Sequence, residues 1–333
     1  MSVLVIAEAG VNHNGSLECA KEMVDIAKES GADFVKFQTF NADLLVLKDA
    51  TKAEYQIAGK NDLETQYELL KRLELSEDMH WEIKRYCDLR DITFISTAFD
   101  IKSVKFLRQM GQDLFKIPSG EVTNLPYLRF IGSMGCKIIM STGMCDLRDV
   151  NLALDALTSS GAKHSDITLM HCTSQYPAPF SELNLSCIKT LAVEFGTKVG
   201  YSDHTLGIEA SIAAVAIGAN VIEKHFTLSR LMNGPDHSAS LEPKELEAMI
   251  SAIRNIDLAM GNGVKVAAEC EIKNRDCVRK SIVAASFINE GELFTEDNLT
   301  TKRPGDGISP MYWDLIIGRR ANQRYLKDQQ ILL

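Results

Sequence analysis

The stretch "VLVIAEAGVNHNGSLECAKEMVDIAKESGADFVKFQT", residues 3–39, contains one complete strand–helix–strand unit. The apolar runs at 3–9 and 33–39 have the length and β-branched content of buried strands. The segment between them has helical hydrophobic spacing and stops at Gly31. Because a strand that returns through a helix lies parallel to the first strand, this unit predicts a parallel sheet covered by helices.

The same unit recurs along the chain, and one of its later helices has Ser76 as a candidate N-cap. Eight repeats within about 260 residues favour a closed barrel over an open doubly wound sheet. The sequence therefore predicts an α/β fold, a (β/α)₈ TIM barrel, with strands at 3–9, 33–39, 93–99, 114–120, 137–143, 166–172, 198–204 and 221–226.

The hydrophobic pattern changes after about residue 262, where short β-like runs and turn signals replace long helices. We expect a barrel domain at 1–262, a charged linker at 263–279 and a small domain at 280–333. Because a unit of roughly 55 residues buries little surface, we expect it to dock on the barrel or on a partner chain.

Composition excludes several classes of protein. The net charge of −9 argues against nonspecific nucleic-acid binding, because no basic excess exists to neutralise phosphates. No apolar run approaches the length of a membrane span and no secretory signal is recognisable, so we expect a cytoplasmic protein without a membrane segment. The eight cysteines form no CxxC pair, which favours reduced core thiols over disulfides or a zinc site.

Polar residues end nearly every predicted strand. In a barrel the carboxyl ends of all the strands meet at one face, where catalytic groups gather, so a converging site explains this shared polarity. The strand-end residues are Glu8, Lys36, Gln38, Thr97, Lys116, Ser119, Ser141, His171, Ser202, His204 and the run from Glu223 to His225.

The glycine loop after the first strand does not match a nucleotide-binding motif. Gly10 and Gly15 fit GxxxxG, but Ser16 stands where a phosphate-binding loop needs lysine, and the spacing lacks GxGxxG. Glu8 carries the functional signal, because a carboxylate in an apolar strand is costly unless it is paired or used. For His13 a role in the site and a solvated loop position remain equally open.

Two lysines interrupt apolar strands. Buried lysines are rare without an anion, so Lys36 and Lys116, with Ser119, Ser141 and Ser202 nearby, would suit a phosphate and a carboxylate. A structural ion pair for each lysine is one alternative. Schiff-base formation, as in aldolases, is another.

Two histidines end consecutive strands. His204 and His225 would be neighbours in a barrel and could hold Mn²⁺, Zn²⁺ or Fe²⁺, with water in the open positions. His237, in a loop, is a weaker candidate for a third ligand. We expect His80 and His164 to lie on the surface.

Arg303 stands before a Pro-Gly turn in "KRPGDGIS", residues 302–309. The turn would hold it on a loop. It has a function beyond surface charge only if the small domain covers the mouth of a barrel.

Nine segments in order along the chain together resemble the sialic acid synthase family, whose members condense phosphoenolpyruvate with an N-acetylated mannose-type sugar. The tail resembles that family's antifreeze-like (SAF-type) domain. The resemblance implies a TIM barrel with a small domain swapped over the partner's active site in a homodimer. The segments are "IAEAGVNHNG", "VKFQTF", "FKIPSGE", "IIMSTGM", "LMHCTSQYPAPF", "GYSDHT", "VIEKHFT", "GPDHSASLEP" and "TTKRPGDGISP".

The resemblance also implies a role for each matching residue. His204 and His225 correspond to ligands of a divalent metal, usually Mn²⁺, with Mg²⁺ or Co²⁺ as alternatives, and Glu8 to a catalytic carboxylate. Positions that bind phosphoenolpyruvate correspond to Lys36, Thr97, Lys116, Ser119, Ser141 and Ser202. Positions that face the sugar correspond to Gln38, Glu121, Tyr176, Asp236 and, from the neighbouring subunit, Arg303.

The chain departs from the family pattern at two places. Ala98 stands where a proline is expected, which affects backbone stiffness. Ser174 and Gln175 occupy positions that vary in the family, so a phosphate contact from Ser174 is not implied.

The resemblance implies a synthase that makes a nine-carbon sialic-type acid and phosphate. The motifs are slightly closer to the branch that makes N,N'-diacetyllegionaminate from 2,4-diacetamido-2,4,6-trideoxymannose. Synthesis of N-acetylneuraminate from N-acetylmannosamine is the alternative. A Schiff-base nonulosonate lyase and a non-catalytic sugar-binding protein are more remote ones.

Overall fold

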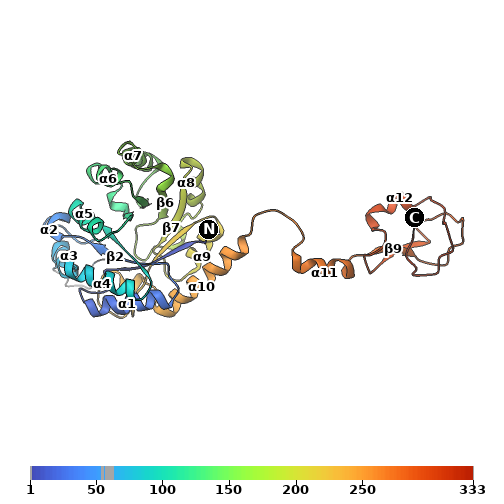
Figure 1. The fold of residues 1–333 in the computed structure, drawn as a ribbon, viewed down its shortest axis with the longest axis horizontal. Helices are drawn as coiled ribbons and strands as arrows, with labels where there is room; N and C mark the ends of the chain where they lie inside the picture. Colours follow the sequence, from blue (N-terminus) through green and yellow to red (C-terminus); the bar gives the residue numbers. More distant parts are fainter. Residues whose placement is uncertain (1, 54–55, 57–63, 333) are drawn as a thin grey trace. The chain divides into compact units, whose positions relative to one another are not determined.

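Eight parallel strands form a closed barrel in the computed structural model, which describes residues 2–53, 56 and 64–332 (Figure 1). The chain divides into two units, Met1–Gly261 and Asn262–Leu333, and the barrel belongs to the first. The prediction of a TIM barrel is confirmed. Its strands are β1 (Leu4–Gly10), β2 (Phe34–Thr39), β3 (Thr93–Ala98), β4 (Leu114–Ile117), β5 (Lys137–Ser141), β6 (Ile167–Cys172), β7 (Lys198–Asp203) and β8 (Val221–His225).

Pairing of β1 with both β2 and β8 closes the barrel. In this register Glu8 stands opposite Lys36 on one side and His225 on the other. Three of the residues singled out in the sequence therefore meet where the first and last strands join.

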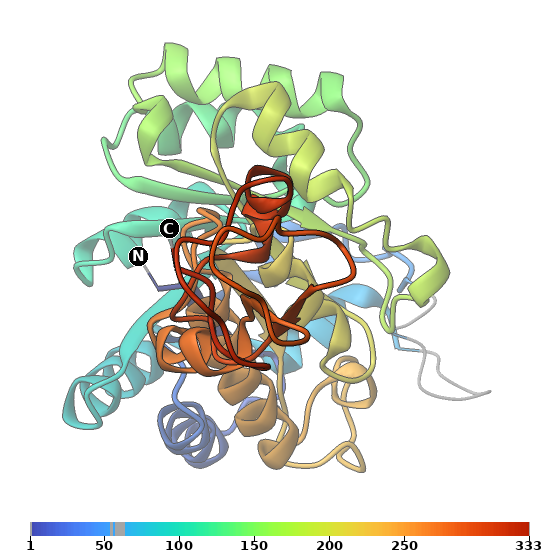
Figure 2. The same cartoon turned by 90° about the vertical axis from the view of Figure 1, so that its right-hand side faces the viewer.

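A ring of helices surrounds the strands (Figure 2). Ser16 caps α1 and Ser76 caps α4, the second as predicted, through their side-chain oxygens, and Gly31 follows α1 with φ +85°. The helices of this unit are α1 (Leu17–Glu29), α2 (Ala42–Leu45), α3 (Gln66–Leu73), α4 (Glu77–Leu89), α5 (Ile101–Gln109), α6 (Leu125–Gly132), α7 (Leu147–Ser159), α8 (Cys187–Phe195), α9 (Glu209–Ala216) and α10 (Pro243–Met260).

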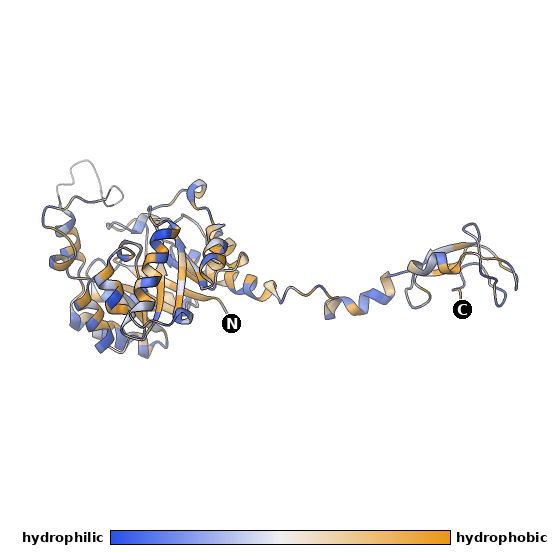
Figure 3. Ribbon diagram, turned by 90° about the horizontal axis from the view of Figure 1, so that it is seen from above, coloured by the Kyte–Doolittle hydropathy of each residue, from blue (hydrophilic) through white to orange (hydrophobic). Residues whose placement is uncertain are grey.

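The main core lies between the strands and the helices, and the strands are largely hydrophobic in Figure 3. A second, smaller cluster includes Ile6, Ile95, Ile139, Met170 and Val221, each on a different strand. Since side chains alternate in direction along a strand, the residue two positions further on faces the same way. This apolar layer closes the barrel interior beneath the polar ends of the strands.

The second unit is built around a short antiparallel pair, β9 (Ser281–Ala284) and β10 (Leu299–Lys302), with helix α12 (Trp313–Ile316). It has its own core, which includes Ile282, Phe294 and Tyr325. The segment expected to be a linker contains helix α11 (Glu269–Val278), of which no residue is buried.

One surface prediction is wrong and one is confirmed. His80 is buried: its Nε2 lies 2.8 Å from Thr39 Oγ1 and its Nδ1 lies 2.9 Å from the Ser76 carbonyl oxygen. It occupies the face of α4 that packs on the barrel. His164 is exposed, as expected.

All eight cysteines are free thiols, but not all are core residues, because Cys270 and Cys277 on α11 are exposed. Within the part of the chain that the structure describes, no helix has both the length and the apolar character needed to cross a bilayer.

Candidate active site

A cavity of about 500 Å³ opens at the carboxyl ends of the barrel strands. Of the residues to which the family resemblance gives a role, all except Arg303 line it: Glu8, Lys36, Gln38, Thr97, Lys116, Ser119, Glu121, Ser141, Tyr176, Ser202, His204, His225 and Asp236.

The strand pleat explains this convergence. Glu8 follows Ile6 by two residues, and Ser141 follows Ile139, so both polar side chains face the interior just beyond the apolar layer. On β8, the same spacing of two residues relates Val221, Glu223 and His225. Inward-facing residues at every second strand position therefore form both the apolar layer and the polar lining of the cavity above it.

Two lysines and two glutamates form a buried cluster in the cavity. Lys36 Nζ lies 2.8 Å from Glu8 Oε2 and 3.6 Å from Glu223 Oε2, and it donates to Thr97 Oγ1 at 2.8 Å. Lys116 Nζ lies 3.4 Å from Glu223 Oε1. Ser202 also donates to Glu223, at 3.1 Å, so Glu223 joins both lysines and a third strand.

Burial and charge set the protonation of these groups. Burial raises the pKa of Glu8 to about 7, although Lys36 opposes the shift. Burial also acts on Glu223, but Lys116 and Lys36 outweigh it and lower its pKa to about 2. Burial lowers the pKa of Lys116, whereas for Lys36 the two carboxylates outweigh burial and raise it. The cluster therefore holds one ionised carboxylate, Glu223, one carboxyl whose pKa lies near neutrality, Glu8, and two buried lysines.

The sequence motifs assign no role to Glu223 beyond that of a polar residue at the end of its strand. The signal that could have identified it is its spacing of two residues from His225, which places both side chains on the inner face of β8.

Hydroxyl groups also line the cavity. Ser141 Oγ is buried and has no hydrogen-bond partner among the described residues, so it can donate to a ligand. Ser119 Oγ accepts a hydrogen bond from the Gly143 backbone at 3.0 Å. A Cβ atom at Gly143 would come within 2.2 Å of Ser174 Oγ and 2.9 Å of Ser119 Oγ, so these two serine side chains would have to move. Ser174 also lines the cavity.

The two predicted metal ligands are adjacent, with ring centroids 5.6 Å apart. His204 Nδ1 lies 2.8 Å from the Thr173 carbonyl oxygen, which fixes its proton on Nδ1 and leaves Nε2 as the electron-pair donor. His225 is buried, and this burial is the main reason why its pKa lies well below the usual value. Its Nδ1 has no hydrogen-bond partner in the described chain. In their neutral forms, the two imidazoles would fit a divalent metal.

Other candidate ligands lie apart from this pair. His237 Nδ1 bonds to Thr227 Oγ1 at 2.7 Å, and His13 Nδ1 accepts from the Gly15 backbone at 2.9 Å. Both are buried outside the cavity lining, so the solvated loop position considered for His13 is wrong. Among the described residues no group of three or more His, Cys, Asp and Glu side chains is arranged to hold a metal. A metal here would have two protein ligands and open positions for water and substrate.

A buried ion pair outside the cavity holds the two histidine-bearing strands together. Lys224 Nζ lies 2.9 Å from Asp203 Oδ2, and Lys224 also donates to the Thr205 carbonyl at 2.6 Å. His204 lies between Asp203 and Thr205, so this pair fixes the backbone on both sides of it.

The remaining polar groups lie around the histidines and across the cavity. The Tyr176 ring stacks on His204 at 4.0 Å between centroids. Asp236 Oδ2 lies 3.8 Å from His225 Nδ1, and burial raises the pKa of Asp236 to about 6. Gln38 Nε2 donates to Glu8 at 3.4 Å, while Glu121 accepts from Asn124 at 2.6 Å.

Arg303 belongs to the second unit. Its Nε donates to the Val278 carbonyl at 2.9 Å, and its side chain is exposed. This contact fixes the loop "KRPGDGIS" against the end of α11.

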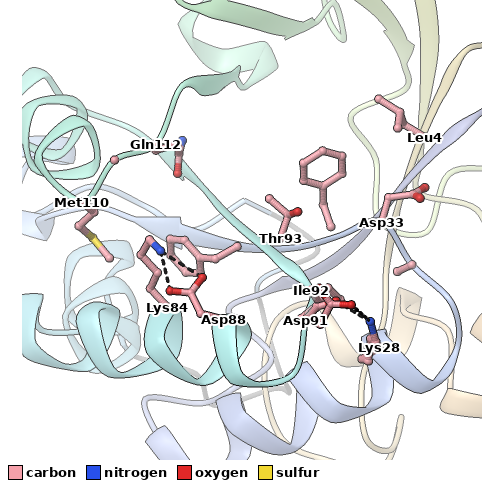
Figure 4. Close-up of a pocket in the computed structure, with 14 residues that line it drawn as sticks. Leu4, Lys28, Asp33, Lys84, Asp88, Asp91, Ile92, Thr93, Met110 and Gln112 are labelled. Carbon is pink, nitrogen blue, oxygen red and sulfur yellow. Dashed lines mark hydrogen bonds and ion pairs between the residues drawn. The ribbon is translucent and has the colours of Figure 1, made fainter.

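A second cavity, of about 710 Å³, lies at the opposite end of the strands, where Leu4, Phe34 and Thr93 line it (Figure 4). Its lysines are paired with its aspartates: Lys84 with Asp88 at 2.8 Å and Lys28 with Asp91 at 3.2 Å. The amino ends of barrel strands serve stability rather than catalysis. The cavity at the carboxyl ends is therefore the candidate active site.

Known proteins share both the sequence and the fold. The NeuB family model matches residues 23–265, and the SAF domain model matches residues 279–333. N,N'-diacetyllegionaminic acid synthase of Campylobacter jejuni is 51% identical over 98% of both chains. The synthase of the same name from Legionella pneumophila is 48% identical over 97% of this chain and 91% of its own.

A solved structure gives the same result. The N-acetylneuraminic acid synthetase of Leptospira borgpetersenii, crystallised with citrate, superposes with a TM-score of 0.72 at 31% identity and covers 82% of this chain and 90% of its own. The motifs, the barrel, its cavity and these relatives agree. This chain belongs to the NeuB family, the sialic acid synthase family that its motifs resemble, and carries a SAF domain at residues 279–333.

Proposed function

We propose that this protein is a nonulosonic acid synthase that condenses phosphoenolpyruvate with open-chain 2,4-diacetamido-2,4,6-trideoxymannose and water, giving N,N'-diacetyllegionaminate and phosphate. The observation that carries the proposal is the buried cluster of Lys36, Lys116, Glu8 and Glu223 beside the His204–His225 pair. The relatives at 48–51% identity, both named N,N'-diacetyllegionaminic acid synthase, support this choice of sugar.

The anion site suits phosphoenolpyruvate. Lys36 and Lys116 are buried in the cavity, and Ser141 has a hydroxyl available for a ligand. Charge-assisted bonds to the phosphate and carboxylate would fix the plane of the enol. Thr97, Ser119 and Ser202 would complete the set.

The histidine pair would hold a divalent metal, and we propose Mn²⁺, with Mg²⁺ or Co²⁺ as alternatives. Bound there, the metal would polarise the aldehyde oxygen of the open-chain sugar. Tyr176, stacked on His204, and Asp236, beside His225, would position that end of the sugar, with Gln38 and Glu121 contacting it elsewhere.

The chemistry then follows from the substrates. C3 of phosphoenolpyruvate attacks the aldehyde carbon, forming the new C–C bond and leaving a cationic C2. Water adds to C2, and phosphate leaves with cleavage of the C2–O bond. Glu8 has a pKa near neutrality, so it can accept the proton of that water and stabilise the cation.

We further propose that the enzyme is a cytoplasmic homodimer in which the SAF domain covers the partner's cavity. Exposure of Arg303 and the absence of any buried residue in α11 are consistent with surfaces that meet a second chain. Arg303 would then contact the N-acyl group of the sugar in the neighbouring site.

Phosphate release tests the proposed function directly. The enzyme is incubated with phosphoenolpyruvate, Mn²⁺ and either 2,4-diacetamido-2,4,6-trideoxymannose or N-acetylmannosamine. We expect release with the first sugar and less with the second. Faster release with N-acetylmannosamine would favour an N-acetylneuraminate synthase instead, and sugar binding without release would favour a binding protein.

A Schiff-base lyase is the remaining competitor. An imine-forming lysine must lose its proton, yet Lys36 is paired with two carboxylates that raise its pKa. Lys116, whose pKa burial lowers, is the better candidate for such a reaction. Trapping of pyruvate on the protein by borohydride would favour the lyase.

A further inference from the structure

One side of the catalytic cavity is apolar. Phe40, Leu45, Leu69, Leu70, Leu73 and Phe99, here called the apolar wall, line the cavity and belong to one hydrophobic cluster. Leu69 and Leu73 are buried, whereas Leu45, Leu70 and Phe99 are only half-buried. The wall therefore presents hydrocarbon to the cavity in addition to packing on itself.

The wall comes from the segments that follow β2 and β3. Phe40 directly follows β2, Phe99 directly follows β3, and their rings meet edge to face at 6.1 Å between centroids. Helices α2 and α3 supply the leucines. In the closed order of eight strands β3 lies opposite β7, which carries His204 beyond its end, so the part of the wall that follows β3 faces His204 across the cavity.

Two side-chain amides accompany the wall. Gln66 Nε2 donates to Gln56 Oε1 at 3.2 Å, and both residues line the cavity. A ligand that rests here meets hydrocarbon together with amides, rather than the charges found at the lysines and histidines.

We infer that the apolar wall selects the acceptor sugar by binding the end remote from its aldehyde, namely the C6 methyl group and the C4 acetamido group of a 6-deoxy sugar. This inference rests on the proposed function. With the aldehyde at the histidines, the far carbons of an extended six-carbon chain point across the cavity. A C6 methyl group buries well against leucine and phenylalanine, and an acetamido group matches the neighbouring amides.

The same surface disfavours N-acetylmannosamine. Its C6 hydroxyl would lose its hydrogen bonds to water without gaining a partner on the apolar wall. Its C4 hydroxyl, in place of an acetamido group, would give the side-chain amides of Gln56 and Gln66 no amide group of the ligand to bind. An apolar pocket rejects an analogue that adds a hydroxyl by up to about a hundredfold. Discrimination of about 10- to 100-fold in kcat/KM is therefore expected.

The test compares kcat/KM for the two sugars in variants of the intact protein. Leu45→Gln and Leu70→Gln each place an amide on the wall at a half-buried helical position. Leu44→Gln is the matched control, because Leu44 is on the same helix as Leu45, is 57% exposed and does not line the cavity. Leu70→Met keeps the wall apolar.

We expect the ratio of kcat/KM for the 6-deoxy sugar over N-acetylmannosamine to fall about tenfold in Leu45→Gln and Leu70→Gln. It should stay within about twofold of the wild-type ratio in Leu44→Gln and Leu70→Met. An unchanged ratio in both glutamine variants, or an equal loss for both sugars, would overturn the inference. So would a wild-type preference for N-acetylmannosamine, although the synthase reaction would stand. If neither sugar releases phosphate, the proposed function itself fails.

Discussion

Lys36 Nζ lies 2.8 Å from Glu8 Oε2. Both side chains are buried, and the two residues stand opposite each other in the register of β1 and β2. The lysine stabilises the ionised form of Glu8, while burial favours the neutral form. The balance leaves Glu8 able to exchange a proton near neutral pH. This is the property that a general base in the proposed reaction needs.

Replacing Glu8 with glutamine should remove catalysis and keep substrate binding. Glu8→Gln retains the shape and the hydrogen-bonding oxygen but cannot accept a proton. We expect kcat to fall by about 10²- to 10⁴-fold, with phosphoenolpyruvate affinity changed only a few-fold. Phosphate release and calorimetric titration measure the two effects. Near-normal turnover would refute the role assigned to Glu8.

Replacing Glu223 should make the protein depend on its substrate for stability. Glu223→Gln leaves Lys36 and Lys116 buried with one fewer carboxylate, and breaking a buried pair costs about 3–5 kcal/mol of unfolding free energy. Phosphoenolpyruvate supplies the missing negative charge and no longer competes with Glu223. We expect a lower melting temperature without ligand and a larger rise on adding phosphoenolpyruvate than in the wild type.

Glu245→Gln is the control for this comparison, because it also removes a carboxylate that is paired with a cation, Arg230, but lies outside the cavity lining. It should leave the ligand-induced shift close to that of the wild type. Equal shifts in wild type and Glu223→Gln would argue against direct competition at the lysines.

The strand pattern predicted the barrel and most of the cavity lining because both depend on a period of two. Once eight strands are parallel, inward polar residues at their carboxyl ends must converge, as Glu8, Lys36 and Ser141 do. The burial of His80 depends on helical spacing instead, because it lies on the same face of α4 as the buried residues Ile83 and Cys87.

The apolar wall could not be predicted in the same way. Its leucines lie on α2 and α3, in the segment that connects β2 with β3. The period of two that applies to strands does not apply to this segment. Apolar residues in such a segment are expected to pack on the barrel. Only the structure places Leu45 and Leu70 in the lining of the same cavity as Glu8 and Lys36.

Metal binding should distinguish the His204–His225 pair, as the proposed ligands, from the other histidines. We expect EDTA to abolish phosphate release and Mn²⁺ to restore it. His204→Ala and His225→Ala should lose Mn²⁺ binding in calorimetric titration, because each removes one of two protein ligands. His237→Asn should retain it, since the His237 ring nitrogen Nδ1 bonds to Thr227 and lies outside the cavity lining. Loss of binding in that variant would make His237 a third ligand.

Acid should destabilise the barrel through His13. Burial, aided by His80 and His237, lowers the pKa of His13 from 6.5 to about 4. Between these values the unfolded chain binds a proton that the folded chain does not, so stability falls as the pH falls from about 6.5 to about 4. The loss from this residue is about 3 kcal/mol, and above pH 6.5 it contributes none.

His13→Asn tests this contribution, because the asparagine oxygen can accept the Gly15 hydrogen bond that Nδ1 accepts. Urea unfolding near pH 7.5 and near pH 4.5 should show a smaller difference in this variant than in the wild type. The exposed His164 provides the control, and His164→Asn should keep the wild-type difference. If the difference is unchanged in His13→Asn, the pKa of His13 is the same in the folded and the unfolded protein.

Mixing two inactive variants should restore activity if the SAF domain serves the partner's site. Glu8→Gln inactivates the barrel cavity, whereas Arg303→Ala removes the residue proposed to reach the neighbouring sugar. In a mixed dimer with exchanged domains, one site carries both defects and the other carries neither. Unfolding and refolding an equal mixture should therefore recover about a quarter of wild-type phosphate release, from random pairing of two chains. Refolding each variant alone gives the background. If Arg303 instead acted on the cavity of its own chain, every site in the mixture would keep one defect, and activity would stay at the background of the separate variants.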